Sequence, residues 1–364
     1  MGADGRRRIG GQGLSGLRGS GGFPKGGSTM PVSYESPGSA SSVRPGRAAL
    51  HLARAASLAP SPHNSQPWLF VEEGHDHGFE VHLHGGRRMM LTDPGGREAV
   101  IACGAALFNV RIAVRLLGFR PAVELLPESG NSRCQAHVGY AVHAPATPDE
   151  TLLARAMARR HTHRGPFESE PDTLLDELSG LARGEGAVLQ VVDEPEQLGL
   201  LADLVRTAED LHRSDPRRAA EIIRSVGPGG VPVEACRHHP DATLLAGRDY
   251  LGLTPYCPRP SHRWSGRTGT VAVLSTPCDS RADWLRAGQA LQRVLLHAAA
   301  HDVAAAFHTQ PLELRAPRAE IRAHLAGGMF PQVVLRLGRA PRMWRTARRP
   351  PAEVLVRDAP PVQG

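Results

Sequence analysis

The first candidate site in this sequence is the polar run at residues 59–67, Ala-Pro-Ser-Pro-His-Asn-Ser-Gln-Pro. It lies between a helix-like segment and the strand-like Trp-Leu-Phe, and it contains the amides of Asn64 and Gln66. An amide group both donates and accepts hydrogen bonds, so such a loop suits the edges of a flat heterocycle. Ser and Asn also cap helices and form turns. That simpler interpretation explains two of these residues but not the whole run.

A second candidate site is the basic run ARRHTHRGPF at residues 158–167. Arg159, Arg160, His161 and Arg164 can carry positive charge there, and the hydroxyl of Thr162 can donate a hydrogen bond. Arginine guanidinium groups match phosphate oxygens in pairs, so the run is suited to an anionic ligand. A solvated basic helix end that complements the helix dipole remains the alternative for this stretch.

The elements around these two runs are typical of an α+β protein. The apolar spacing predicts helices over 46–59, 97–119, 148–160, 171–186, 195–213, 283–302 and 318–327. Strand patterns occupy 68–73, 79–85, 121–127, 135–143, 187–193, 269–276, 304–310 and 331–340. The helix over 97–119 is too apolar to lie on a surface, so we expect it in the core.

Composition divides the chain into four parts. Residues 1–45 are rich in Gly, Ser and Pro and are predicted to be a disordered tail. A first half over 46–150 and a second half over 151–356 follow, and 357–364 form a short tail. Residues 213–266, within the second half, are rich in Pro, Gly, His and Arg and show little periodicity. A stretch of that length is either disordered or a functional cover. Because it also contains Tyr250, Tyr256 and Trp264 in an aromatic-poor chain, we expect a lid-like insert.

The two halves show weak self-similarity. Gly104-Ala105-Ala106-Leu107 aligns with Gly288-Gln289-Ala290-Leu291, and the same offset brings Val123 onto Phe307 and Pro127 onto Pro311. In both halves a long helix is followed by a strand, a gap and a second strand. The pattern favours a duplicated unit. Coincidence between two Ala- and Leu-rich helices is the alternative.

Composition also argues against several classes of protein. The chain has 364 residues and a net charge of +7, but 42 of its 43 basic residues are arginines without the aromatic interleaving of a nucleic-acid surface. Its five cysteines form no CxxC pair, which favours reduced thiols and a cytoplasmic location. We expect no membrane-spanning segment and no secretory signal. The histidines of GHDHGFEVHLHG and CRHHPD lack regular zinc-ligand spacing, so no metal site is predicted.

Together the two polar runs resemble motifs of the FMN-dependent nitroreductases. APSPHNSQPWLF is similar to their PSxxNxQPW segment, and RRHTHRGPF to their phosphate-binding segment, although the two stand here in reversed order. In that family one subunit of a homodimer supplies the phosphate-binding arginines and its partner supplies the loop. The reversed order is therefore consistent with two fused halves. The pattern resembles the Acg family of fused, FMN-binding nitroreductase relatives, with DPGGREAVIACGAALFN and WLRAGQAL as further similarities.

The resemblance implies an α+β nitroreductase-like fold of two pseudo-repeats with one FMN per chain. It assigns to the ring-facing loop Pro60, Ser61, Pro62 and Asn64, and to the phosphate and ribityl group Arg160, His161, Thr162 and Arg164. It places Thr309 and Gln310 near the reactive edge of the flavin, and it makes Arg348 and Arg349 candidates for closing over the phosphate.

The function implied is that of an oxidoreductase in which FMN carries hydride from NAD(P)H to a small organic acceptor. No catalytic acid or base is demanded by the sequence. The chain is expected to be a monomeric pseudo-dimer or a weak homodimer. Two alternatives remain open: a protein that stores FMN under a closed lid with little turnover, and a binding module without flavin.

Overall fold

A computed structural model describes residues 45–74, 77–128, 132–170, 174–252, 254–256, 267–341 and 344–357. All of these ranges belong to a compact unit that begins at Arg44. The two predicted tails therefore lie almost wholly outside the described residues, as do Trp264 and part of the predicted insert.

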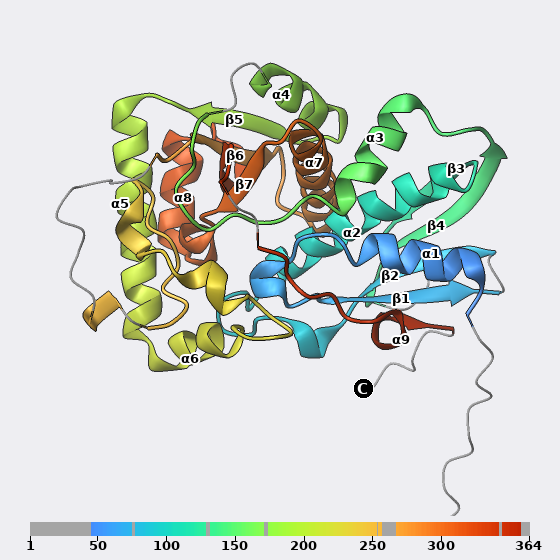
Figure 1. The fold of residues 1–364 in the computed structure, drawn as a ribbon, viewed down its shortest axis with the longest axis horizontal. Helices are drawn as coiled ribbons and strands as arrows, with labels where there is room; N and C mark the ends of the chain where they lie inside the picture. The colour runs from blue at the N-terminus through green and yellow to red at the C-terminus, as the bar shows by residue number, and fades with distance from the viewer. Residues whose placement is uncertain are drawn as a thin grey trace, which may run out of the picture. The chain divides into compact units, whose positions relative to one another are not determined.

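The first half of the described chain forms an antiparallel sheet with two helices (Figure 1). In chain order its elements are α1 (Arg47–Ala56), η1 (Pro62–Asn64), β1 (Trp68–Glu73), β2 (Gly78–Leu83), η2 (Gly85–Arg87), α2 (Arg97–Leu116), β3 (Phe119–Leu125) and β4 (Cys134–His143). Helix α2 is long and apolar enough to cross a membrane, yet most of it is buried inside the protein. It is the core helix that the sequence predicted.

The second half contains another antiparallel sheet, preceded by the connecting helix α3 (Pro148–Met157). Up to the second sheet strand its elements are α4 (Leu175–Gly184), β5 (Val188–Val192), α5 (Pro195–Ser214), α6 (Pro216–Arg224), η3 (Val233–Cys236), η4 (Pro240–Ala242), η5 (Thr254–Tyr256) and β6 (Thr270–Thr276). Then follow α7 (Arg281–Ala300), β7 (Ala304–Phe307), η6 (Gln310–Glu313), α8 (Arg315–His324), β8 (Phe330–Gly338), α9 (Pro351–Val354) and β9 (Leu355–Val356).

Four strands of the first sheet have the same order as the four strands of the second. The first runs β3-β4-β2-β1-β9 and the second β7-β8-β6-β5, so every strand except β9 has a counterpart in the other half, and every pairing among the matched strands is antiparallel. In both halves a long helix connects the second strand to the third. This confirms the prediction of an α+β fold made of two pseudo-repeats.

The long helices α2 and α7 cross at two glycines. A Cβ atom on Gly104 would lie 2.3 Å from the carbonyl oxygen of Leu285, and one on Gly288 would lie 2.0 Å from that of Ile101. Gly104 and Gly288 are as many residues apart in the chain as Ile101 and Leu285 are, so each glycine contacts the counterpart of the residue that the other glycine contacts. The two contacts are therefore reciprocal. Reciprocal contacts are the signature of a two-fold interface. The two helices can approach this closely because neither glycine has a side chain.

A second pair of reciprocal contacts lies where each long helix begins. Arg97, the first residue of α2, donates to the side-chain oxygen of Gln332 on the second sheet at 3.2 Å. Arg281, the first residue of α7, donates to the side-chain oxygen of Gln135 on the first sheet at 3.0 Å. Each half thus fixes the other with an arginine and a glutamine in equivalent positions.

The second sheet is covered on both faces, which explains the nearly continuous apolar run in β6. Ala272 and Leu274 pack with α4 and α7, whereas Val271 and Val273 pack with α5 and α8. The C-terminal segment instead returns to the first sheet, where β9 pairs in parallel with β1. The first sheet therefore includes a strand that is distant in the chain from its other four strands.

The insert lies between β5 and β6, and its described part is more regular than the sequence indicated. Helix α6 falls inside the stretch in which the sequence showed little periodicity, so this helix was not predicted. The helix begins with a good local start signal. The side chain of Asp215 accepts hydrogen bonds from the backbone N–H groups of Arg217 and Arg218, and Pro216 occupies the first helical position.

Candidate functional site

The polar loop before β1 has an unusual backbone. His63, Asn64 and Gln66 have positive φ angles of 49°, 60° and 51°. Residues other than glycine rarely adopt this backbone conformation. It costs about 1–3 kcal/mol for each residue, and such residues cluster at functional sites. Local bonds hold the loop in place, because the backbone N–H of Gln66 donates to Ser61 Oγ at 3.0 Å. The strain marks this loop as part of a site.

A large pocket lies where this loop meets the second half. The volume open to the centre of a water-sized sphere is about 140 Å³, and the pocket is partly open to solvent. Its apolar wall is built mainly from small or slender side chains of the two long helices and the second sheet. These residues are Ile101, Ala102, Ala105, Leu291, Ala306 and Val333.

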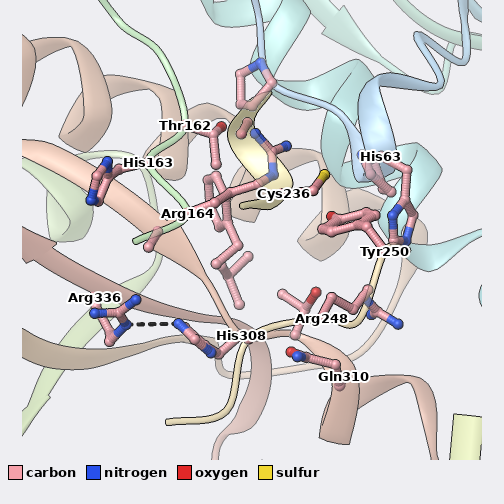
Figure 2. Close-up of a pocket in the computed structure, with 18 of the residues that line it drawn as sticks. His63, Thr162, His163, Arg164, Cys236, Arg248, Tyr250, His308, Gln310 and Arg336 are labelled. Carbon is pink, nitrogen blue, oxygen red and sulfur yellow. Dashed lines mark hydrogen bonds between the residues drawn. The ribbon is translucent and has the colours of Figure 1, made fainter. Parts of the chain in front are cut away.

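One polar corner of the pocket is formed by the loop and the insert. The rings of His63 and Tyr250 meet edge to face, with centroids 5.6 Å apart (Figure 2). Arg164 lies over the same tyrosine, its guanidinium carbon 5.7 Å from the ring centroid. Burial lowers the pKa of His63 well below its usual value, and the charges of Arg248 and Arg164 lower it further. The imidazole is therefore neutral at physiological pH.

Another polar corner is a chain of hydrogen bonds that starts at Arg336 of β8 and passes through His308, the residue after β7. Arg336 Nε donates to His308 Nε2 at 2.7 Å, and the other ring nitrogen of His308 lies 3.0 Å from the carbonyl oxygen of Ala246 (Figure 2). Gln310 Nε2 donates to the same carbonyl at 3.3 Å. Burial, followed by the charge of Arg336, lowers the pKa of His308, so this ring is neutral too. A neutral ring that accepts from Arg336 donates to Ala246.

Beside the pocket lies a cluster of arginines, defined here as Arg160, Arg164 and Arg348. The guanidinium groups of Arg160 and Arg348 both donate to the carbonyl oxygen of Leu58, at 3.2 and 3.4 Å. Arg160 Nε, Arg164 Nη1 and Arg348 Nε are buried with no hydrogen-bond partner among the described residues. Within that part of the chain, none of the three pairs with a carboxylate. The cluster thus presents unused donors and uncompensated positive charge.

The pKa values around this cluster reflect the crowding of like charges. Burial lowers the pKa of Arg160 to about 9, and the charges of Arg348 and Arg164 add to the effect. Burial also lowers the pKa of Arg348 to about 10. For His161, burial and then Arg160 lower the pKa to about 4. An anion placed among these groups would reverse the electrostatic part of each shift.

The segment that carries Arg160 and Arg164 is held against the second sheet. Thr162 forms a parallel bridge with Ala305, and the backbone N–H of His163 donates to the carbonyl oxygen of Ala305 at 2.8 Å. Arg160 is buried just after the end of α3, and the chain then meets β7 at this one bridge. The part of the basic run from Thr162 to Gly165 lines the pocket.

A carboxylic acid also faces the pocket from the first turn of α2. Glu98 accepts a hydrogen bond from Arg97 at 3.1 Å. Burial, followed by the nearby charge of Glu313, raises the pKa of Glu98 to about 8. Glu98 is therefore mostly protonated at neutral pH and can donate a hydrogen bond into the pocket.

The insert forms a wall of the pocket and is fixed to both halves. Ten of its residues line the pocket: Ala235, Cys236, His238, His239, Pro240, Ala242, Thr243, Gly247, Arg248 and Tyr250. Arg248 forms a buried ion pair with Glu313. Glu221 of α6 accepts hydrogen bonds from Leu91 N at 3.0 Å and Thr92 N at 2.9 Å. Tyr256, in contrast, is 84% exposed.

Seven of the twelve residues predicted for the site line the pocket: Pro60, Ser61, Pro62, Thr162, Arg164, Thr309 and Gln310. The other five do not line it. Arg160 and Arg348 belong to the arginine cluster, and His161 lies close enough for the charge of Arg160 to affect it. Asn64 uses its amide to hold Gly229, Gly230 and Ala347, and it accepts from Arg348. The guanidinium of Arg349 pairs with Glu353.

Sequence reasoning missed several residues of the pocket. Arg336 is a charged residue inside an otherwise apolar strand, which was a usable signal, whereas Glu98 stands beside Arg97 in the first turn of α2, where an acidic residue is ordinary. His308 stands next to the predicted Thr309, but its hydrogen-bond partners come from distant parts of the chain. Cys236 stands in CRHHPD, which was considered only as a source of zinc ligands, and nothing local distinguished Arg248 from the other polar residues of the insert.

Two proteins of one organism are related to this chain in sequence. The chain is 32% identical over 321 residues to "Uncharacterized protein Rv3127" of Mycobacterium tuberculosis H37Rv, covering 84% of this chain and 92% of that protein. It is also 32% identical over 313 residues to "Putative NAD(P)H nitroreductase acg" of the same organism, covering 82% of this chain and 92% of the relative. The chain therefore belongs to the Acg family of nitroreductase-like proteins.

Solved structures resemble it more remotely. A nitroreductase from Desulfitobacterium hafniense, described with bound FMN, is 13% identical, with a TM-score of 0.37 over 54% of this chain and 93% of the other. No protein-family model matches the sequence.

Proposed function

We propose that this protein is an FMN-binding oxidoreductase, with one FMN per chain, that passes hydride from NAD(P)H to a small organic acceptor. The observation that carries the proposal is the arginine cluster beside the pocket. Buried arginines that share one carbonyl and pair with no described carboxylate require a compensating anion. A phosphate ester is a suitable anion, because arginine binds phosphate oxygens in pairs.

The donors of the cluster fit a terminal phosphate. The buried groups Arg160 Nε, Arg164 Nη1 and Arg348 Nε are without partners among the described residues. The hydroxyl of Thr162 lies on the same segment and suits the polyol chain of the cofactor. Arg160 donates to the carbonyl oxygen of Leu58, and Arg348 donates to those of Leu58 and Ala59. The first half thus orients arginines that come from the second half.

The pocket beyond the cluster fits a flat ring system. Ala102, Ala105 and Ala306 line it with small side chains, and Pro60 and Pro62 give its rim a stiff apolar surface. Ser61, Thr309 and Gln310 supply polar groups where a heterocycle carries donors and acceptors. Such a slot would hold the ring and exclude water from its faces.

Bound FMN would supply the redox chemistry, since it can accept and release a hydride. The residues of the chain would bind and orient the cofactor, and the protonated Glu98 and neutral His63 would present hydrogen-bonding groups toward the pocket. The name of the mycobacterial relative supports NAD(P)H as the electron donor. The bound FMN described for the Desulfitobacterium protein is consistent with the choice of cofactor.

The phosphate contact can be tested by replacing a single arginine. Arg160→Ala should weaken FMN binding by roughly 1.5–3 kcal/mol, the worth of a hydrogen bond to a charged group. Riboflavin, which lacks the phosphate, should lose much less affinity. Both affinities can be measured by flavin fluorescence. Arg159→Ala is the matched control, because Arg159 is half exposed and pairs with Asp302. Equal weakening of both ligands by Arg160→Ala would contradict the phosphate assignment.

One observation favours a second function, FMN storage. The insert lines the pocket and contacts both halves. Its Arg248 pairs with Glu313 of the second half, and its Glu221 accepts hydrogen bonds from the backbone of the first half. A cover that stays closed would protect a bound flavin but keep nicotinamide from its ring. The rate of reduction by NAD(P)H distinguishes the two functions.

A further inference from the structure

One histidine-rich segment of the sequence takes no part in the pocket. The stretch GHDHGFEVHLHG contains β2, in which Glu80 and His82 are two residues apart. Residues at this spacing in a strand project from the same face of the sheet. Glu80 Oε2 lies 2.6 Å from His82 Nε2. By itself this is a histidine–carboxylate pair.

The neighbouring strand adds a thiol to this pair. In the ladder between β2 and β4, His82 lies opposite Cys134, at a point where the register shifts between Val81 and His82. The candidate ligand atoms of Glu80, His82 and Cys134 all lie within 4.8 Å of one another. His82 is 2% exposed and Cys134 3%, whereas Glu80 is partly open to solvent. Three different ligand types thus converge at one buried place.

The spacing suits a metal ion. Atoms this close share a centre about 2.8 Å or less from each of them, and small side-chain rotations would bring that to the 2.0–2.3 Å of zinc bonds. Thiolate and imidazole together select zinc and similar borderline metals over Mg²⁺ or Ca²⁺. Three protein ligands leave a fourth tetrahedral position for water.

We propose that Glu80, His82 and Cys134 form a zinc-type metal site on the first sheet. The bound ion links β2 to β4, which are neighbours in that sheet. It is separate from the proposed flavin site, to which the first half contributes the loop before β1 and helix α2. The sequence could not reveal it, because Cys134 stands far from the histidines in the chain and only the strand pairing brings them together.

The test uses untagged full-length protein, stripped with a chelator and titrated with Co²⁺ as a spectroscopic substitute for Zn²⁺. We expect one equivalent to produce a thiolate-to-cobalt charge-transfer band in the near ultraviolet, and Zn²⁺ to abolish it. Cys134→Ser should remove the band and weaken metal binding by more than about 100-fold, since even outer-shell changes cost 10–100-fold. Zn²⁺ should also raise the melting temperature of the stripped wild-type protein, but not that of the variant.

Cys278→Ser is the matched control, because Cys278 is an exposed free thiol in the second half. It should keep both the band and the thermal shift. Circular dichroism of the stripped proteins shows whether Cys134→Ser remains folded, and Glu80→Gln offers a second variant on the open side of the site. The proposal is overturned if no cobalt–thiolate band forms, or if the band survives in Cys134→Ser.

Discussion

At the scale of single residues, the pocket is notable for ionisable groups that have lost water. Burial favours the neutral forms of Glu98, His63, His308 and Arg336, raising the pKa of Glu98 and lowering those of the other three. In each case burial favours the uncharged form, whether the group is an acid or a base. Such shifts are typical of binding and catalytic sites, where desolvation strengthens every interaction with a ligand.

The shift at Glu98 predicts a pH dependence of stability. Its pKa is about 8 in the folded chain against an ordinary 4.5, so between these values the folded state holds a proton that the unfolded chain has released. The free energy of unfolding therefore falls as pH rises through this window. Glu98→Gln carries no such proton. Its stability relative to wild type should rise from pH 5 to pH 9, by about 1.4 kcal/mol for each unit of pKa shift.

Urea unfolding at pH 5, 7 and 9 measures this difference. Glu196→Gln is the control, because Glu196 is an exposed glutamate in the first turn of α5. A difference between Glu98→Gln and wild type that does not change with pH would contradict the assignment.

Much of the pocket could be predicted at this scale and part of it could not. Pro60, Ser61 and Pro62 were visible as a polar loop, and Arg164 as part of a basic run, because each lies in a dense local pattern. The hydrogen bond between His308 and Arg336 could not be predicted, because it depends on how β7 and β8 pair, and no local pattern specifies that register.

At the scale of elements, the crossing of α2 and α7 holds the two halves together. The sequence predicted both helices and their similarity, since long apolar helices have a strong periodic signal. It could not predict that Gly104 and Gly288 meet. Nor could it predict that β9 would join the first sheet, because a two-residue strand has no pattern of its own.

The helix crossing predicts an unusual response to alanine. Alanine normally stabilises a helix by about 1 kcal/mol relative to glycine. At Gly288 its Cβ would overlap backbone atoms of α2, including Ile101 O at 2.0 Å and Ala105 N at 2.8 Å. These atoms cannot move aside without displacing the helix. Gly288→Ala should therefore lower the free energy of unfolding by roughly 1–3 kcal/mol, as overpacked cores do.

Gly199→Ala is the matched control, because Gly199 lies inside α5 and a Cβ there would meet nothing within 4 Å. It should raise the free energy of unfolding by about 0.5–1 kcal/mol. Both variants can be compared with wild type by urea unfolding. Equal stabilisation by the two substitutions would mean that the helix crossing adapts freely.

At the scale of the whole molecule, the duplicated halves have diverged into complementary parts. The first half contributes the strained loop and Glu98 to the pocket. The second half contributes the basic run, the hydrogen-bonded pair His308 and Arg336, and the insert. The insert occupies the connection between β5 and β6. Its counterpart in the first half, between β1 and β2, is only the short segment 74–77. The pseudo-symmetry is therefore broken at an element that forms part of the pocket wall.

If the insert acts as a cover, it should control how fast NAD(P)H reduces a bound flavin. If the insert must open before NAD(P)H can reach the ring, opening limits the rate. Glu221 holds the insert to the first half through Leu91 and Thr92, so Glu221→Ala should favour the open form. Each 1.4 kcal/mol lost from the closed form corresponds to about tenfold faster reduction. Dithionite, a small reductant, should reduce wild type and variant alike.

Anaerobic stopped-flow absorbance of the FMN-loaded protein measures both reactions. Glu234→Ala, which removes an exposed glutamate from the same insert, should leave both rates unchanged. Slow reduction of the wild type by NAD(P)H together with fast reduction of Glu221→Ala would establish a gated oxidoreductase. Slow reduction of both would favour storage of the flavin. Rapid reduction of the intact protein, unaltered by Glu221→Ala, would show that the insert does not gate the site, because a closed cover cannot be both limiting and insensitive to the contacts that hold it.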